Sequence, residues 1–213
     1  KLAMNGEELK QSIKACEGRV IMSEHVIAVS PLLGDVSNPE LAAAFGSDLC
    51  LLNVFDCNNP KIAGVVTDGN PVALLKKLIG RPVGCNLEPV DPDAKMMEEC
   101  LRIPAGRMAS AETFKKAQQL GFNFVCLTGN PGTGVTNESI ARAIKNAKKY
   151  FSGLIIAGKM HSAGVDEPLV DLKAIGKFIE AGADVILLPA VNTVPSLSEE
   201  EMRAACDFIH RKG

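Results

Sequence analysis

Short apolar runs alternate with amphipathic stretches along almost the whole chain. Each run is rich in Val, Ile and Leu, and each following stretch has apolar residues at helical spacing. The runs predict strands over residues 20–29, 48–55, 81–87, 122–128, 154–157 and 184–189. The amphipathic stretches predict helices over residues 1–16, 38–45, 72–79, 110–120, 136–150, 171–181 and 198–211. Strict alternation of strand and helix, without hairpin signals, favours a parallel sheet.

The junctions between helix and strand favour a barrel over an open, doubly wound sheet. A similar phrase recurs at residues 45–48, 120–123 and 181–184, in which a Gly is followed two positions later by Asp or Asn. The Gly is expected to end each helix in a left-handed turn. Similar junctions repeated along the chain fit a ring better than a sheet whose helices cross to both faces. We therefore predict an α/β fold of the (β/α)8 TIM-barrel type.

The number of strand–helix units is smaller than a complete barrel requires. A barrel has eight strands and typically about 250 residues, whereas the 213 residues contain six such units. We expect residues 1–213 to form a single barrel domain that is truncated, with two C-terminal units missing from this chain. The alternative is an open barrel that a partner chain completes, because exposed strand edges promote association. We also expect a homo-oligomer.

Composition argues against several classes of partner. The net charge is −2 with both signs interspersed, which does not favour binding to nucleic acid or to an acidic membrane surface. No apolar run is long enough to span a bilayer, and the first 14 residues lack the basic-then-apolar order of a secretory signal. The seven cysteines include no C-x-x-C pair and lie mostly in apolar runs. We therefore expect reduced, buried thiols and a cytoplasmic protein.

Polar side chains follow every predicted strand, and a parallel barrel has its functional face at these strand ends. Four of them are candidate catalytic groups, namely Lys159, Glu88, Asp56 and His161. Lys159 can form a Schiff base, or act as an acid or an oxyanion partner. Alternatively, it forms an ion pair with Glu88 or Asp56 that only holds the strand ends together. His161 is a candidate acid–base group or, alternatively, an ordinary loop histidine.

Amide side chains and a glycine-rich loop are candidates for substrate binding. The candidates are Asn53, Asn86, Asn130, Gly132, Thr133, Gly134 and Asn192. The asparagines can orient oxygen atoms of a ligand. The loop over residues 129–134 precedes a predicted helix, so its N–H groups and the helix N-terminus can hold an oxyanion. The alternative is that Thr136 or Asn137 only caps that helix.

A divalent metal ion such as Mg²⁺ is a candidate cofactor. Asp56, Glu88 and Glu24 offer carboxylate oxygens, which are ligands that Mg²⁺ prefers, and neighbouring amide oxygens can assist. The long segment over residues 89–110 can form a lid above these groups. Arg107 in that segment can reach an anionic ligand, or be a solvated surface residue.

Five phrases span nearly the whole chain: LLNVFDCNNP, GRPVGCNLEPVD, LTGNPGTGVTNESI, IIAGKMHSAG and EAGADVILLPAVNTVP. They resemble a family of uncharacterised bacterial barrel proteins that are sometimes labelled as similar to phosphoenolpyruvate phosphonomutases. This resemblance implies a (β/α)8 barrel that extends beyond residue 213. The K-x-C-G-H loop and the paired-aspartate metal motif of the phosphonomutase/isocitrate lyase superfamily do not occur in the sequence. The resemblance therefore does not carry over that superfamily's Mg²⁺-dependent chemistry.

These features together predict a lyase or isomerase that acts on a small anionic metabolite, expected to be phosphorylated, at the mouth of the barrel. Lys159 would be the electrophilic or acid–base group, and Glu88 or Asp56 the counter-base. One alternative is a metal-assisted hydrolase that uses Asp56, Glu88 and His161. The other is a non-catalytic metabolite-binding or scaffold protein, which would bind its ligand without turnover.

Overall fold

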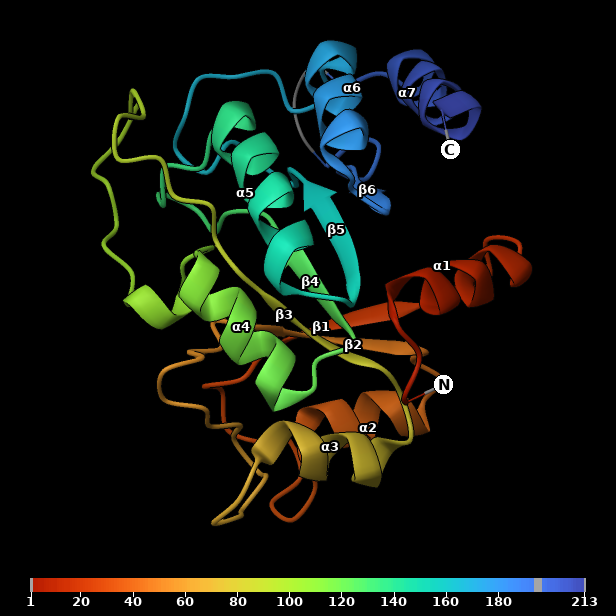
Figure 1. Cartoon of the computed structure of the whole chain (residues 1–213), viewed down its shortest axis with the longest axis vertical. Helices are drawn as coiled ribbons and strands as arrows, with labels where there is room; N and C mark the ends of the chain where they lie inside the picture. Colours follow the sequence, from red (N-terminus) through yellow and green to blue (C-terminus); the bar gives the residue numbers. More distant parts are fainter. Residues whose placement is uncertain (1, 194–196, 213) are drawn as a thin grey trace.

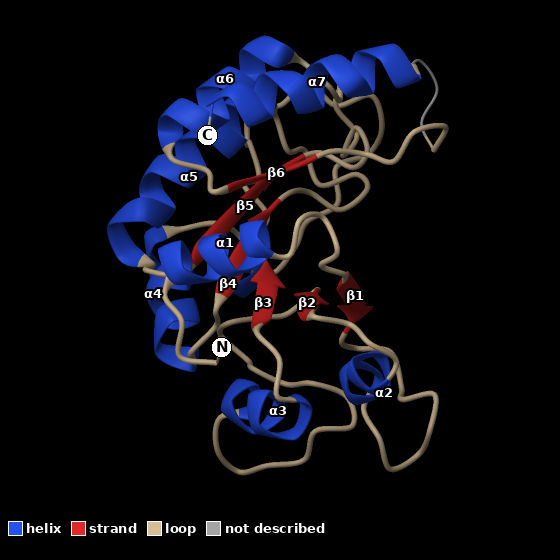
Figure 2. Cartoon of the chain, turned by 90° about the vertical axis from the view of Figure 1, so that its right-hand side faces the viewer, coloured by secondary structure: helices blue, strands red, loops and turns tan. Residues whose placement is uncertain are grey.

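A curled parallel sheet organises residues 2–193 and 197–212, which the computed structural model describes. Its strands are β1 (Met22–Val26), β2 (Leu49–Asn53), β3 (Val83–Asn86), β4 (Phe124–Leu127), β5 (Leu154–Gly158) and β6 (Val185–Leu187). They pair in chain order, and every neighbouring pair is parallel. Figure 2 shows the strands following one curve with helices outside it. Within these residues the fold is a half-barrel, which confirms the barrel type over a doubly wound sheet.

The predicted helices form close to their expected bounds. They are α1 (Gly6–Ala15), α2 (Asn38–Ala44), α3 (Pro71–Ile79), α4 (Ala111–Leu120), α5 (Asn137–Tyr150), α6 (Leu172–Ala181) and α7 (Glu199–Lys212). A short 3₁₀ helix, η1 (Ala105–Arg107), was not predicted. Figure 1 shows α4, α5 and α6 following one another along the outside of the sheet. No helix in the two described ranges is both long and apolar enough to cross a membrane.

The recurring phrase at the junctions has two physical roles. Gly46, Gly121 and Gly182 have φ of 100°, 82° and 104°, a left-handed conformation that favours glycine. The polar residue two positions later receives a backbone N–H from the neighbouring strand region: Asp48 from Ile21 at 3.0 Å, Asn123 from Val83 at 3.2 Å and Asp184 from Ile155 at 2.9 Å. These bonds tie β2, β4 and β6 to the strands that precede them.

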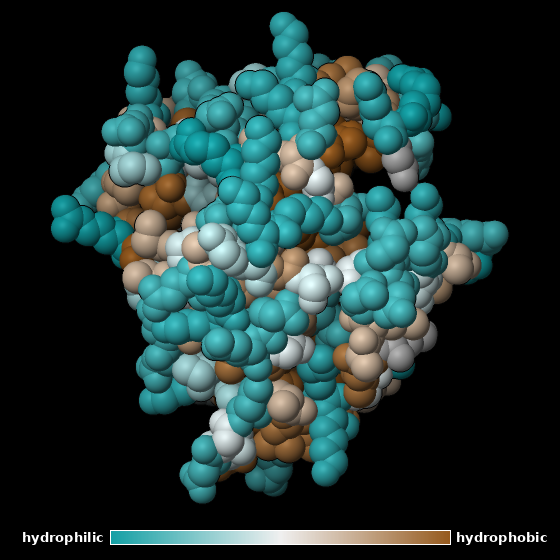
Figure 3. Space-filling view, in the orientation of Figure 1, coloured by the Kyte–Doolittle hydropathy of each residue, from teal (hydrophilic) through white to brown (hydrophobic). Residues whose placement is uncertain are grey.

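Alternation along the strands divides the apolar core into two layers. Side chains such as Cys50 and Leu52 pack outward against the helices, whereas Leu49 and Leu51 face the inside of the half-barrel. Leu9 of α1 joins the inner layer. All seven cysteines are free and four of them are buried, as expected for reduced thiols acting as small apolar groups. The face in Figure 3 is mainly hydrophilic, with hydrophobic atoms in scattered patches.

Candidate active site at the carboxyl ends of the strands

Three asparagine side chains meet where β2, β3 and β4 end. The Oδ1 of Asn53 accepts the Nδ2 of Asn86 at 3.3 Å and the Nδ2 of Asn130 at 3.1 Å. It also accepts the backbone N–H of Val54 at 2.8 Å, and the Nδ2 of Asn53 donates to the Oδ1 of Asn130 at 2.9 Å. Asn53 and Asn86 are both buried. Asn53 is therefore the centre of an amide cluster, which the structure assembles from residues predicted to bind substrate.

Two carboxylates border this amide cluster. The Oε1 of Glu24, on β1, accepts the Nδ2 of Asn53 at 2.6 Å. Glu88 lies beyond the end of β3 and is only 1% exposed. Its Oε2 accepts the backbone N–H of Asn130 at 2.8 Å, and its Oε1 accepts an Nη2–H of Arg107 at 2.6 Å. Two of the three predicted carboxylates, Glu24 and Glu88, thus reach the strand ends, and Glu88 is buried there and paired with Arg107.

Arg107 is held against Glu88 by the backbone as well as by its side chain. The N–H of Glu88 donates to the carbonyl of Arg107 at 2.8 Å, and the N–H of Ala109 donates to the carbonyl of Glu88 at 2.8 Å. Gly106 permits this arrangement, because a Cβ there would overlap the Oδ1 of Asp56. Of the two interpretations of Arg107, a solvated surface residue is ruled out by the short ion pair and by a side chain only 18% exposed.

Two atoms at this site have no hydrogen-bond partner. Among the described residues, Asn86 Oδ1 and Arg107 Nε are the two buried side-chain polar atoms left unpaired. One is an acceptor and the other a donor, and both residues contact members of the same network. Unpaired buried polar atoms cost on the order of 1–3 kcal/mol each. Such atoms are expected where a ligand or an ordered water supplies the missing partners.

His161 lies in the loop after β5 and is half-buried. Its Nδ1 accepts the backbone N–H of Ala163 at 3.1 Å, so the neutral ring carries its proton on Nε2. Burial is the main cause that lowers its pKa below the usual value; the Lys159 charge lowers it further, and the charges of Glu24 and Glu88 oppose this. At neutral pH the imidazole is therefore mainly uncharged, and its Nε2–H is able to donate a hydrogen bond.

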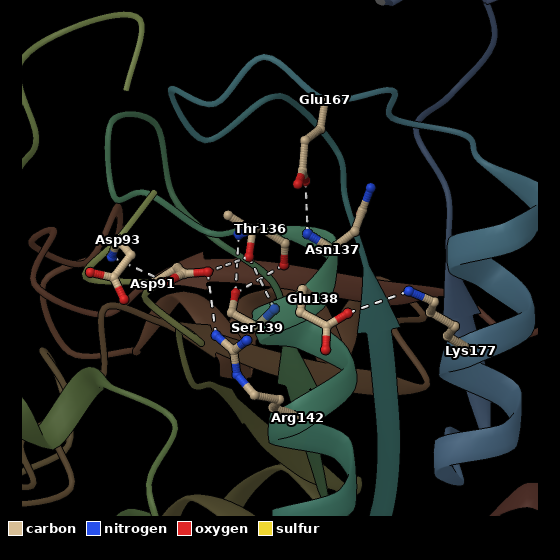
Figure 4. A network of polar contacts seen from close by, with 9 residues as sticks. All are labelled: Asp91, Asp93, Thr136, Asn137, Glu138, Ser139, Arg142, Glu167 and Lys177. Carbon is tan, nitrogen blue, oxygen red and sulfur yellow. Dashed lines mark hydrogen bonds and ion pairs between the residues drawn. The ribbon is translucent and has the colours of Figure 1, made fainter. Parts of the chain in front are cut away.

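Lys159 is almost completely buried and is paired with a residue that the sequence interpretation did not name. Its Nζ lies 2.7 Å from the Oε2 of Glu167, and not in an ion pair with Glu88 or Asp56 as the alternative interpretation expected. Glu167 also accepts the backbone N–H of Asn137 at 2.7 Å (Figure 4). The loop between β5 and α6 brings Glu167 back to Lys159, which no periodicity in the sequence signals. An electrophilic role for Lys159 stays a prediction.

Within the described residues, no hydrogen bond joins the Asp56 side chain to the amide cluster. Its Oδ1 accepts the N–H of Asn58 at 2.7 Å, and its side chain lines a groove of about 640 Å³ together with Ile27 and Val54. The three carboxylates predicted as metal ligands are therefore not gathered into one cluster. No group of three or more His, Cys, Asp or Glu side chains within residues 2–193 and 197–212 is placed to hold a metal ion.

The glycine-rich loop contacts the predicted lid. The N–H of Gly134 donates to the carbonyl of Ala163 at 2.9 Å, and the N–H of Leu101 donates to the carbonyl of Gly132 at 2.8 Å. The N–H of Thr133 donates to the carbonyl of Asn130 at 3.3 Å. Two N–H groups of the proposed oxyanion cradle are thus used within the protein, and the cradle stays a prediction.

Two further candidates lie at helix and strand ends. The Oγ1 of Thr136 accepts the N–H of Ser139 at 3.0 Å, so Thr136 caps α5, as the alternative interpretation expected. Figure 4 shows this cap beside Asp91 and Arg142. Asn192 follows β6, is exposed, and has a left-handed φ of 64°. Its predicted role in substrate binding stays a prediction.

Comparisons with known proteins identify a matching family and several structures with a similar fold. The sequence profile of a family described as a domain of unknown function (DUF7916) matches residues 1–213. No curated protein sequence matches the chain. A 2,3-dimethylmalate lyase, a member of the PEP mutase/isocitrate lyase superfamily, has a similar structure with a TM-score of 0.56 at 13% identity. That alignment covers 94% of this chain and 67% of the lyase.

Two other solved structures have similar folds. Phosphonopyruvate hydrolase, solved with oxalate and Mg²⁺, has a TM-score of 0.54 at 14% identity, over 93% of this chain and 67% of the hydrolase. Oxaloacetate acetylhydrolase, solved with its product oxalate, has a TM-score of 0.54 at 14% identity, over 95% of this chain and 68% of that enzyme. At these identities the likeness establishes the barrel fold and not the chemistry. The structural neighbours are thus of the phosphonomutase-like kind that the sequence phrases suggested.

Proposed function

We propose that this chain, which belongs to the family described as a domain of unknown function (DUF7916), is a lyase or isomerase that acts on a small carboxylate- or phosphate-bearing metabolite. The ligand would bind at the amide cluster of Asn53, Asn86 and Asn130. The observation that carries this proposal is that one buried hydrogen-bond network contains both the unpaired acceptor of Asn86 and the unpaired donor of Arg107. An acidic ligand would supply the acceptor that Arg107 lacks, and a cation bound with it would pair with the Oδ1 of Asn86, so the cost of leaving both atoms unpaired would be removed.

The charges of the site define what the ligand needs. Glu24 and Glu88 contribute two negative charges, and Arg107 contributes one positive charge through its 2.6 Å ion pair with Glu88. A guanidinium can hold a carboxylate or phosphate oxygen through more than one N–H. An anionic ligand beside two carboxylates nevertheless requires further positive charge, because like charges repel strongly where water is scarce.

A divalent cation such as Mg²⁺ would supply that charge, and the residues present fit it. The unpaired Oδ1 of Asn86 and the carboxylate of Glu24 are hard oxygen donors, and Glu88 joins the same network through the N–H of Asn130. Mg²⁺ is commonly held by one or two protein carboxylates while it keeps several waters. Glu24, Glu88 and Asn86 would hold the ion, and when bound it would polarise an oxygen atom of the ligand.

Stabilisation of an oxyanion would fall to His161. Its Nδ1 is occupied by the N–H of Ala163, which leaves the Nε2–H to donate a hydrogen bond to an oxyanion that forms during the reaction. The similar structures support this reaction class, because they are a lyase and two hydrolases, and both hydrolases were solved with oxalate.

Calorimetric titration with oxalate, with and without Mg²⁺, tests the proposed site. We expect saturable binding in the presence of Mg²⁺ and a loss of affinity of about tenfold or more in Arg107→Met, because hydrogen bonds to charged groups contribute roughly 1.5–3 kcal/mol. Arg142→Met is the matched control: this arginine pairs with Asp91 at 3.3 Å at an exposed position. Equal affinity in wild type and Arg107→Met, or no binding with or without the ion, would contradict the proposal.

A further inference from the structure

The loop between β5 and α6 carries His161 and is tied together at two distant positions. Lys159 directly follows β5, and Glu167 stands eight positions later, yet their charged groups lie 2.7 Å apart. His161 stands between these two residues in the sequence. The ion pair therefore closes the part of the loop in which His161 lies.

The two partners of this ion pair are buried to different degrees. The side chain of Lys159 is 1% exposed, whereas that of Glu167 is 27% exposed. The Oε2 of Glu167 accepts two hydrogen bonds, from Lys159 and from the N–H of Asn137 in the first turn of α5. Figure 4 shows Glu167 reaching from its loop to that N–H. A carboxylate at a helix N-terminus is also stabilised by the helix dipole, so Glu167 joins the loop to both β5 and α5.

Backbone contacts fix the rest of the loop, and the orientation of the His161 ring depends on these contacts. Ala163 has a left-handed φ of 53° and is 1% exposed. Its carbonyl accepts the N–H of Gly134, and its own N–H donates to the Nδ1 of His161. The next carbonyl, of Gly164, accepts the N–H of Met97. A change in the path of this loop would therefore move the group that orients the imidazole.

We propose that Lys159 and Glu167 form a clasp that closes this loop and positions His161 at the carboxyl ends of the strands. Glu167 is then a positioning residue, and so is Lys159, which acts as a fixed charge rather than as a nucleophile. The use of His161 in catalysis rests on the proposed function. The clasp itself requires no ligand, so the clasp and the proposed function can be refuted separately.

Imidazole NMR signals of protein labelled in its three histidines test the clasp directly. We expect Glu167→Gln to shift or broaden the His161 signals at constant pH, while the signals of His25 and His210 stay in place. Glu138→Gln is the matched control, because it removes a carboxylate from the same first turn of α5. The carboxylate of Glu138 pairs with Lys177 at 3.4 Å, and both side chains are exposed. Lys159→Arg should preserve the His161 signals, because it keeps a cation at that position.

Two results would overturn the clasp. One is an unchanged set of His161 signals in folded Glu167→Gln. The other is reductive trapping of pyruvate on Lys159 by borohydride, seen as a mass increase on its peptide, because that would make Lys159 a nucleophile. If Glu167→Gln does not fold, Lys159→Met combined with Glu167→Met removes both charges together. The clasp then predicts displaced His161 signals in that double variant, and unchanged signals would refute it.

Discussion

Burial favours the uncharged form of two imidazoles in the folded chain. Desolvation lowers the pKa of His25, and the same cause, reinforced by Lys159 and opposed by Glu24 and Glu88, lowers the pKa of His161. The unfolded chain has histidines near the ordinary pKa of about 6.5. Between the two values the unfolded state binds more protons, so this contribution to stability is present above about pH 6.5 and is lost as the pH falls towards the folded-state pKa.

We therefore predict that the free energy of unfolding decreases between about pH 7.5 and about pH 5.5. Urea denaturation at several pH values within this window measures the slope. The double variant His25→Gln and His161→Gln should have a clearly shallower slope, because it lacks both groups. A wild-type slope of the opposite sign, or an unchanged slope in the double variant, would contradict this assignment.

The residues of the site differ in how far the sequence could predict them. Asn53, Asn86 and Glu88 could be predicted, because a polar side chain at the end of an otherwise apolar run needs a partner or a ligand. Only the structure shows that Arg107 and Glu167 each form a short ion pair with a buried side chain at the candidate site. Both lie in long loops, and their partners come from chain positions that no local pattern connects to them.

At the level of the strands, the absence of a side chain at Gly84 makes room for the ring of Phe124 on the neighbouring strand. Gly84 is on the middle of β3, and a Cβ there would overlap the ring of Phe124, which is fully buried on β4. The ring thus occupies the space that a side chain at position 84 would need. This fit belongs to the inner layer, where side chains of adjacent strands meet.

We predict that Gly84→Ala lowers the free energy of unfolding by about 1–3 kcal/mol, the usual cost of overpacking a core. Combining it with Phe124→Leu should cost less than the sum of the two single changes, because the smaller side chain makes room. Chemical denaturation of the three variants measures this coupling. Gly34→Ala is the control, because nothing lies within 4 Å of a Cβ there; strict additivity of the pair would contradict the predicted overlap.

Helices and strands were predictable because their ends carry chemical signals. Asn70 and Pro71 begin α3, with the Oδ1 of Asn70 accepting two backbone N–H groups, and Gly80 ends the helix with a φ of 62°. The 3₁₀ helix at Ala105–Arg107 gave no such signal, because three residues are too few for a periodic pattern. Its position is set by hydrogen bonds to Glu88 and Cys57, which are remote in the sequence.

At the scale of the whole molecule, chain order and strand order coincide. Six parallel strands in sequence order, in the described residues, form the half-barrel that the alternating pattern predicted. Strands β1 and β6 are the edges of this sheet. Further units that complete the barrel, and a homo-oligomer, stay predictions. The reaction could not be predicted at this scale, because one barrel fold supports many unrelated chemistries.

The most direct test of the central claim is turnover at the amide cluster. Purified protein with Mg²⁺ is incubated with a panel of 2-substituted malates, oxaloacetate and phosphonopyruvate, and products are followed by NMR. We predict conversion of at least one acid, lost in Arg107→Met and strongly reduced in His161→Gln, with Arg142→Met unaffected. Oxalate binding without conversion of any acid would contradict the catalytic claim and favour a metabolite-binding protein; conversion that persists in Arg107→Met and His161→Gln would contradict the proposed site.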